Sequence, residues 1–179
     1  NYLKEKSFPV VKFAQVSSKE EAIKKAAEFG YPCYIKIISD KIVHKAKRGF
    51  VKECVNKLDL TKKFEFMLRK AIKIDNKAGI LIQEKAHGIE LIIGLKQDEV
   101  FNKVIMIGSG GILAELRKDI SFRACPITIH DASEMLKELK IFPHIREKIN
   151  LRLVEDLILK TSQLQVKELD INPVMVNTQ

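Results

Sequence analysis

A lysine inside an apolar strand is the first feature of this sequence that could do chemistry. Lys36 lies within the run from Cys33 to Ile38, and Tyr34 and Ile38 flank it on the same strand face, which predicts partial burial. An unpaired ammonium group costs several kcal/mol to bury. An anion should therefore meet it, and a carboxylate of the protein and a phosphate of a ligand are equally good candidates from these residues alone.

The loop that follows this strand is dense in cations and closes on a glycine. Its positively charged or titratable side chains are Lys41, His44, Lys45, Lys47 and Arg48. Cations beside Gly49 make phosphate an attractive partner. Because a neutral imidazole is a competent nucleophile near neutral pH, His44 is a candidate phosphate acceptor. The alternative is a solvated basic loop with a surface histidine.

Isolated charges recur in the other apolar strands. The carboxylates of this kind are Glu84, Glu90, Glu115, Glu168 and Asp170. On the last strand Asp170 and Asn172 share one face, about 6.5–7 Å apart, so both could reach one Mg²⁺ and its bridging phosphate. A polar outer face on an edge strand is the alternative, and Pro173 favours such an edge. Together, one lysine and several strand-borne carboxylates favour a nucleotide–magnesium site.

The common phosphate-binding fingerprints are absent from the sequence. There is no G-x-x-x-x-G-K-[ST] motif, and the segment from Gly108 to Gly111 does not complete G-x-G-x-x-G. This segment can form an anion-binding nest of backbone amides. The local sequence favours a tight connection between strands instead.

The order of the expected elements predicts an α+β fold. Helices are expected near 18–30, 61–74, 131–139 and 147–164, and strands near 10–16, 33–38, 50–55, 78–84, 89–94, 103–107, 112–116, 121–125 and 166–176. Ser18 and Glu21 predict a capping box at the start of the first helix. The strands follow one another as hairpins, which argues against a doubly wound α/β fold.

Composition restricts the class of protein and its partners. With 179 residues, 46% hydrophobic and 31% charged, the chain is long enough for one domain or two small lobes. It shows neither a membrane span nor a signal peptide. The three cysteines lack C-x-x-C spacing, which indicates reduced thiols in a cytoplasmic protein and no zinc site. The net charge of +9 favours an anionic partner, but the dispersed charge and the scarcity of aromatic residues argue against nucleic acid.

In this order the residues resemble the ATP-grasp domain, or β subunit, of the nucleoside-diphosphate-forming acyl-CoA (acetyl-CoA) synthetases, which are relatives of succinyl-CoA synthetase. The matching segments are G-Y-P-C-Y-I-K-I-I-S-D-K-I-V-H-K, I-L-I-Q-E-K-A, G-I-E-L-I-I-G, V-I-M-I-G-S-G-G-I-L-A-E-L-R-K-D-I-S-F-R-A-C-P-I and E-L-D-I-N-P-V. They span nearly the whole chain in the family's order. The resemblance implies a two-lobed ATP-grasp fold over 1–179, with lobes of about 1–84 and 85–179 and nucleotide between them.

The resemblance also implies roles for individual residues. The nucleotide-binding residues that it implies are Lys36, Lys45, Gly49, Glu84, Ala86, Glu90 and Arg123. Of these, Lys36 and Arg123 would lie at the phosphates. Glu84 and the backbone near Ala86 would hold adenine, and Glu90 would bind the ribose hydroxyls. The metal-binding residues that it implies are Glu115, Asp170 and Asn172.

For His44 the resemblance implies catalysis, because it matches a β-subunit histidine that carries phosphate between two distant sites. The family reaction is acyl-CoA + ADP + phosphate ⇌ acid + CoA + ATP. The acyl-CoA chemistry and the first phosphohistidine belong to an α-type, CoA-binding subunit or domain. The resemblance therefore implies a cytoplasmic ligase that binds ATP or ADP and Mg²⁺, forms a hetero-oligomer and is incomplete without its partner.

The sequence departs from the family pattern in several places. Gly49-Phe50 replaces the usual Gly-Gly, and a phenylalanine there could hinder close approach of the backbone to phosphate. The family's R-D-P-x-F-G-P becomes the segment from Gln97 to Lys103. The stretch before Val166 is short, and the chain stops before a strand that usually adds a metal-binding aspartate. A degenerate, non-catalytic module with a regulatory or scaffolding role is therefore the alternative function, and a nucleic-acid-binding domain is a third.

Overall fold

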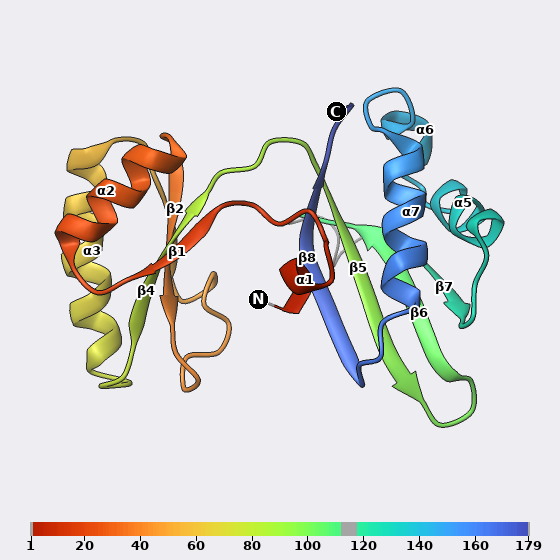
Figure 1. Cartoon of the computed structure of the whole chain (residues 1–179), viewed down its shortest axis with the longest axis horizontal. Helices are drawn as coiled ribbons and strands as arrows, with labels where there is room; N and C mark the ends of the chain where they lie inside the picture. Colours follow the sequence, from red (N-terminus) through yellow and green to blue (C-terminus); the bar gives the residue numbers. More distant parts are fainter. Residues whose placement is uncertain (1, 112–117, 179) are drawn as a thin grey trace. The chain divides into compact units, whose positions relative to one another are not determined.

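Two compact units make up the chain, the first ending at Ala86 and the second beginning at His87. The computed structural model describes residues 2–111 and 118–178. Each unit contains a four-stranded sheet, and every pair of neighbouring strands in the described ranges is antiparallel (Figure 1). Helices and antiparallel hairpins are mixed, so the prediction of an α+β fold is confirmed.

The first unit packs two long helices on one face of its sheet. Its elements are α1 (Tyr2–Glu5), β1 (Phe13–Val16), α2 (Lys19–Phe29), β2 (Cys33–Ile38), β3 (Val51–Cys54), α3 (Lys57–Ile72) and β4 (Gly79–Glu84). The strands lie in the order β1-β4-β2-β3. Figure 1 shows α2 and α3 side by side against this sheet, and no other described helix of this unit packs on the opposite face.

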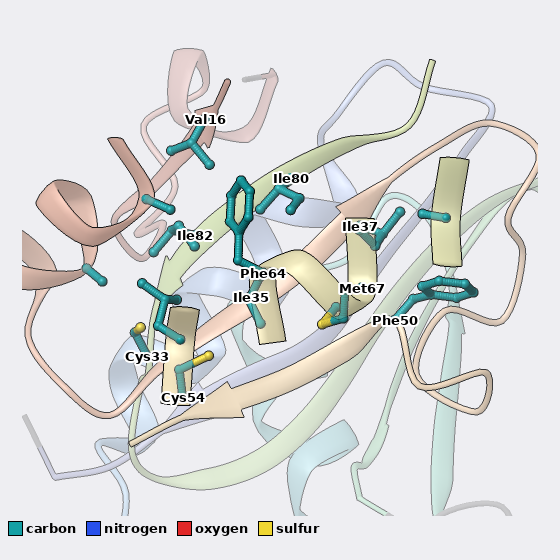
Figure 2. Close-up of a cluster of buried hydrophobic side chains, with 14 of the residues drawn as sticks. Val16, Cys33, Ile35, Ile37, Phe50, Cys54, Phe64, Met67, Ile80 and Ile82 are labelled. Carbon is teal, nitrogen blue, oxygen red and sulfur yellow. The ribbon is translucent and has the colours of Figure 1, made fainter. Parts of the chain in front are cut away.

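Buried and partly exposed side chains alternate strictly along β2, and this alternation decides which of them form the core of the first unit. Cys33, Ile35 and Ile37 are buried beneath the helices, together with Ile80 and Ile82 of β4 (Figure 2). Full burial of one such aliphatic side chain contributes about 1.5–3 kcal/mol. Because the side chains of a strand alternate, the residues between these core positions must lie on the opposite face, which we call the open face.

The second unit repeats the arrangement with different connections. Its elements are β5 (Ile89–Asp98), β6 (Asn102–Ser109), β7 (Ile120–Ala124), α5 (Ile129–Lys137), α6 (Phe142–Ile145), α7 (Leu151–Ser162) and β8 (Glu168–Val176). The strands lie in the order β7-β6-β5-β8, so β8 is an edge strand, as Pro173 predicts. Helices α5 and α7 cover the face that carries Leu91, Ile93 and Leu95. None of the described helices of this unit covers the other face, which we call the open face of this sheet.

Capping side chains explain why some helix boundaries differ from the prediction. The Asn56 side chain accepts from the Asp59 amide, so α3 begins four residues before the predicted Thr61. At α2, Ser18 caps the helix as predicted, but the Glu21 carboxylate accepts from Ser17, and the reciprocal half of the predicted capping box is wrong. The predicted strand 112–116 lies outside the described residues. None of the described helices combines the length and hydrophobicity needed to cross a bilayer.

Candidate functional site

Lys36 lies half-buried on the open face of the first sheet. Its cross-strand neighbours are Val51 in β3 and Leu81 in β4, so apolar side chains flank it on both sides. Within the described ranges the ammonium has no ion-pair partner, and it lies 5.9 Å from the centroid of the Tyr34 ring. Burial lowers the pKa of Lys36. Of the two anions that the sequence allowed, the internal carboxylate is not found in the described chain, and a phosphate of a ligand stays a prediction.

The connection between β2 and β3, residues 39–50, carries the predicted cations. The Arg48 amide donates to the His44 carbonyl at 3.1 Å, and the Phe50 amide donates to the Lys45 carbonyl at 2.8 Å, so the loop folds back on itself. The exposed His44 has a φ of 52°, and Gly49 turns the chain with a φ of 77°. The imidazole of His44 is therefore accessible to a reacting group.

Phe50 lies in the core and not on the open face. Its side chain is fully buried, and Figure 2 shows it in the same cluster as Met67. Its carbonyl accepts from the Ile37 amide at 3.0 Å, so Phe50 stands opposite a residue that faces the helices, whereas Lys36 faces the other way. The expected obstruction of phosphate by this ring is wrong, because the ring is on the helix-covered side of the sheet.

Glu84 and Ala86 lie at the end of the first unit. Glu84 is the last residue of β4 and pairs with Cys33 at the start of β2. Its Oε2 accepts from the Lys12 amide at 3.1 Å, so this carboxylate already has a protein partner. Lys36 is three residues along β2 from the Glu84 pairing position, which is about 10 Å. The first unit thus brings the lysine, the histidine loop and the strand end into one sheet.

In the second unit the glycine-rich segment packs against Glu90. The Gly110 amide donates to the Glu90 carbonyl at 2.7 Å. A Cβ atom on Gly110 would lie 2.8 Å from the Glu90 Cβ, and one on Gly111 would lie 3.4 Å from the Glu90 Oε2. The segment from Gly108 to Gly111 therefore acts as a close-packed strand connection beside Glu90, the reading that the local sequence favours.

Oxygen donors line the edge strand β8. Asp170 and Asn172 are exposed, and Asp170 pairs with Gly94, a residue of the open face of this sheet. No group of three or more carboxylates, histidines or cysteines in the described residues could hold a metal by itself. Mg²⁺ usually takes one or two carboxylates and completes its shell with phosphate and water, so this sparse set fits a phosphate-bound Mg²⁺. Glu115, the remaining predicted ligand, lies outside the described residues.

Arg123 lies on the helix-covered face of the second sheet, opposite to the face of Asp170. It pairs with the buried Ile105, and its guanidinium binds the Glu138 carboxylate with N–O distances of 2.5 and 3.0 Å. The Ser121 hydroxyl donates to the same carboxylate at 2.5 Å. The Arg123 side chain holds the pKa of Glu138 below its usual range. The structure therefore gives Arg123 an internal partner on the helix-covered face, and its role as a phosphate ligand stays a prediction.

The predicted site residues are divided between the two units. The first unit contains Lys36, His44, Lys45, Gly49, Glu84 and Ala86, and the second contains Glu90, Asp170 and Asn172. Sequence reasoning missed Ser39 and Asp75, which are hydrogen-bonded to each other at the start of the histidine loop. A serine directly after an apolar strand is a weak turn signal, and nothing local indicates its distant partner.

Comparisons with known proteins bear on the family to which the chain belongs. The chain matches the ATP-grasp domain family over residues 2–179. It is 35% identical to the β subunit of the ADP-forming acetate–CoA ligase I of Pyrococcus furiosus, over 96% of this chain and 81% of that protein. The resemblance stated from the sequence is confirmed.

Solved structures extend the agreement to three dimensions. A solved structure of the dinucleotide-forming acetyl-coenzyme A synthetase 1 from Ca. Korarchaeum cryptofilum, in complex with coenzyme A, Ca-AMPCP and HgCl+, matches with a TM-score of 0.90 and 30% identity over 99% of this chain and 84% of that chain. Another form of that protein binds coenzyme A and Mg-AMPPCP, with its phosphohistidine segment pointing towards the nucleotide-binding site. It has a TM-score of 0.77 and 30% identity over 98% of this chain and 82% of its own. The chain belongs to the ATP-grasp domain family.

Proposed function

We propose that this chain is the nucleotide-binding subunit or domain of an ADP-forming acyl-CoA synthetase and exchanges phosphate between ATP or ADP and a histidine relay. The observation that carries the proposal is Lys36, half-buried on the open face with no ion-pair partner among the described residues, beside a loop that exposes His44. A nucleotide phosphate satisfies the buried ammonium, and the loop presents a nucleophile next to it.

The chain's own residues supply binding and positioning for this transfer. Lys36 donates to phosphate oxygens, and Lys45 adds positive charge where negative charge develops, because phosphoryl transfer is catalysed mainly by positioning and charge stabilisation. In the direction from ATP, an imidazole nitrogen of His44 forms a bond to the γ-phosphorus. The bond from that phosphorus to the bridging oxygen breaks, its electron pair leaves with ADP, and the ring proton passes to water.

The Asp170 carboxylate and the Asn172 amide of β8 are suitable ligands for a Mg²⁺ ion that is already bound to the nucleotide phosphates. Asp170 and Asn172 would hold Mg²⁺, which supplies neutralisation of the phosphate charge when bound. Glu90, beside the glycine-rich connection, is assigned to the ribose hydroxyls, and Glu84 with the backbone of Ala86 to the adenine. All of these assignments rest on the match to the family's segments together with the faces on which the residues lie.

The proposal includes a partner. The relative from Pyrococcus furiosus is a β subunit, so we assign to this chain a hetero-oligomer with an α-type, CoA-binding subunit or domain that carries out the acyl chemistry. We place the complex in the cytoplasm, because the three cysteines are free thiols and Cys33 and Cys54 are buried. A degenerate module is less well supported, because relatives along nearly the whole chain are named as ligases and Phe50 leaves the open face clear.

The first experiment measures the thermal midpoint with and without Mg²⁺–ATP or Mg²⁺–ADP. A nucleotide at about 100 times its dissociation constant stabilises the fold by roughly 2.7 kcal/mol, which raises the midpoint of a chain of this size by roughly 5–10 °C. Removal of Mg²⁺ with EDTA should reduce the rise. No shift at millimolar nucleotide would contradict the proposal and favour the degenerate module.

A second measurement tests the relay. His44→Ala should retain the nucleotide-dependent shift but lose acid-labile phosphate incorporation from ATP. His130→Ala is the matched control, since His130 is another exposed histidine, located on α5. Labelling that survives His44→Ala and disappears in His130→Ala would refute the role of His44.

A further inference from the structure

A buried hydrogen bond ties the start of the histidine loop to the turn that follows α3. The Ser39 hydroxyl donates to Asp75 Oδ2 at 2.6 Å, and Ser39 Oγ itself accepts from the amides of Lys41 and Ile42 at 3.1 and 3.2 Å. Asp75 Oδ1 accepts from the Lys77 amide at 3.0 Å. Ser39 and Asp75 are 9% and 5% exposed, so water competes little for these groups.

The end of the loop is fixed by a different set of contacts to α3. Phe50 is buried under the helices, and the Lys70 ammonium lies 4.9 Å from the centroid of its ring. The same ammonium donates to the Arg48 carbonyl at 3.1 Å, and the Arg48 guanidinium lies 5.7 Å from the ring. Both ends of the loop are therefore attached to the same helix and the turn that follows it.

Between these attachments the loop tip, residues 43–48, is largely exposed. Ile42 is 1% exposed whereas Val43 is 62% exposed, so the change from a buried to an exposed side chain occurs within one residue. Gly49, with its positive φ, marks the other boundary. His44 is the second residue of the tip and lies only two positions after the buried Ile42. Its position thus depends directly on the Ser39 contacts.

We propose that Ser39 and Asp75 are positioning residues for phosphoryl transfer at His44, and this inference rests on the proposed function. Transfer requires the imidazole nitrogen within about 3–3.5 Å of the phosphorus, and an error of about 1 Å can reduce the rate about 100-fold. The Ser39 hydroxyl accepts from two amides of the loop and donates to one carboxylate of the turn between α3 and β4. Removing it releases the segment that precedes His44 while the apolar core of the sheet keeps its contacts.

The test uses two disrupting variants, one conservative variant and one matched control. Ser39→Ala and Asp75→Ala each remove one side of the hydrogen bond, and Ser39→Thr retains the hydroxyl. Asn56→Ala removes another side-chain cap in the same unit, the one that accepts from the Asp59 amide at 2.9 Å, without touching the loop. It reports what a loss of stability alone does to the reaction.

Three readouts separate positioning from folding and from binding. The first is the rate of phosphate incorporation at His44 from Mg²⁺–ATP, and the second is chemical phosphorylation of His44 by phosphoramidate, which needs no nucleotide. The third is the nucleotide-dependent thermal shift. We expect Ser39→Ala and Asp75→Ala to lower the ATP-dependent rate by about 10- to 100-fold. Phosphoramidate labelling and the thermal shift should stay close to wild type, and Ser39→Thr should recover most of the rate.

Trypsin cleavage within the loop tip adds a measurement of the released segment. Cleavage after Lys45 and Arg48 should accelerate in Ser39→Ala and not in Asn56→Ala. Wild-type rates of ATP-dependent labelling in both disrupting variants would overturn the inference, and so would an equal loss in Asn56→Ala. If wild-type protein is labelled by phosphoramidate but not by Mg²⁺–ATP, the proposed function itself fails, and that outcome is distinguishable from the others.

Discussion

At the scale of single residues, Lys36 combines a cost to the stability of the fold with its proposed role in phosphate binding. Its side chain shares the open face with Tyr34, between apolar residues of both neighbouring strands. Burial disfavours its charged form and lowers its pKa. A folded-state pKa below the unfolded value means that the charged ammonium opposes folding at neutral pH, and that the penalty vanishes once the pH exceeds the unfolded pKa of about 10.4.

Lys36→Met should therefore stabilise the free protein and weaken nucleotide binding. Replacing a half-buried charge that has no ion-pair partner among the described residues by an apolar side chain of similar length should gain about 1 kcal/mol, or roughly 2–4 °C in the thermal midpoint at pH 7. The lost hydrogen bond to phosphate should raise the nucleotide Kd about 10- to 100-fold. Thermal unfolding at pH 7 and pH 10.5, with calorimetric titration of nucleotide, measures both. A destabilised variant with unchanged Kd would contradict this account of Lys36.

At the scale of elements, close approach of backbones sets the position of Glu90. The connection after β6 touches Glu90 of β5 through Gly110, where there is no space for a side chain. The position of the Glu90 carboxylate thus depends on a residue of a different strand connection.

Gly110→Ala should consequently lower both stability and nucleotide affinity, because the added Cβ would lie 2.8–2.9 Å from the Glu90 Cβ and main chain. Such overpacking costs about 1–3 kcal/mol. Gly79→Ala is the control, since its Cβ would meet only the end of the Gln15 side chain at 3.3 Å and an ordinary contact at 3.9 Å. Urea unfolding and nucleotide titration of both variants check the prediction. Equal effects of the two substitutions would refute it.

The sequence predicts the position of a residue well where the signal is local, and it fails to predict contacts between residues that are far apart along the chain. Alternation along β2 correctly predicted the burial of Lys36, and Pro173 correctly predicted an edge strand. Alternation also places Arg123 on one face of β7, but it does not say which face the helices cover. The structure places Arg123 on the helix-covered face, where it pairs with Glu138 in the turn after α5, and no local pattern encodes this contact. The Ser39–Asp75 pair was missed for the same reason.

At the scale of the whole molecule, the pKa values of carboxyl groups in both units depend on their hydrogen-bond partners. Hydrogen bonds from Ser39 and Lys63 hold the pKa values of Asp75 and Asp59 below their usual range in the first unit. Arg123 does the same for Glu138 in the second. A carboxyl whose folded pKa is below its unfolded value stabilises the fold above the unfolded pKa, and this contribution is lost as the pH falls through the folded pKa.

Stability should therefore be nearly constant between pH 7 and about pH 5 and should fall progressively below about pH 4, where the unfolded carboxyls begin to bind protons. Urea midpoints at pH 7, 5, 4 and 3 measure the curve. Glu138→Gln should be less stable at pH 7 and should lose less on acidification, because one of the responsible groups is gone. Constant stability from pH 7 to pH 3 would contradict the proposed contribution of these carboxyl groups to the stability of the fold.

The connection between β2 and β3 is much longer than a hairpin needs. Two to five residues suffice to join antiparallel strands, whereas residues 39–50 separate Ile38 from Val51. Each doubling of a loop costs only about 0.6 kcal/mol of closure entropy, so such an insertion is inexpensive for the sheet. The loop tip can thus be replaced as a unit: evolution or design can exchange residues 43–48 for another reactive sequence while the strands, Ile42 and Phe50 keep the open face of the sheet intact.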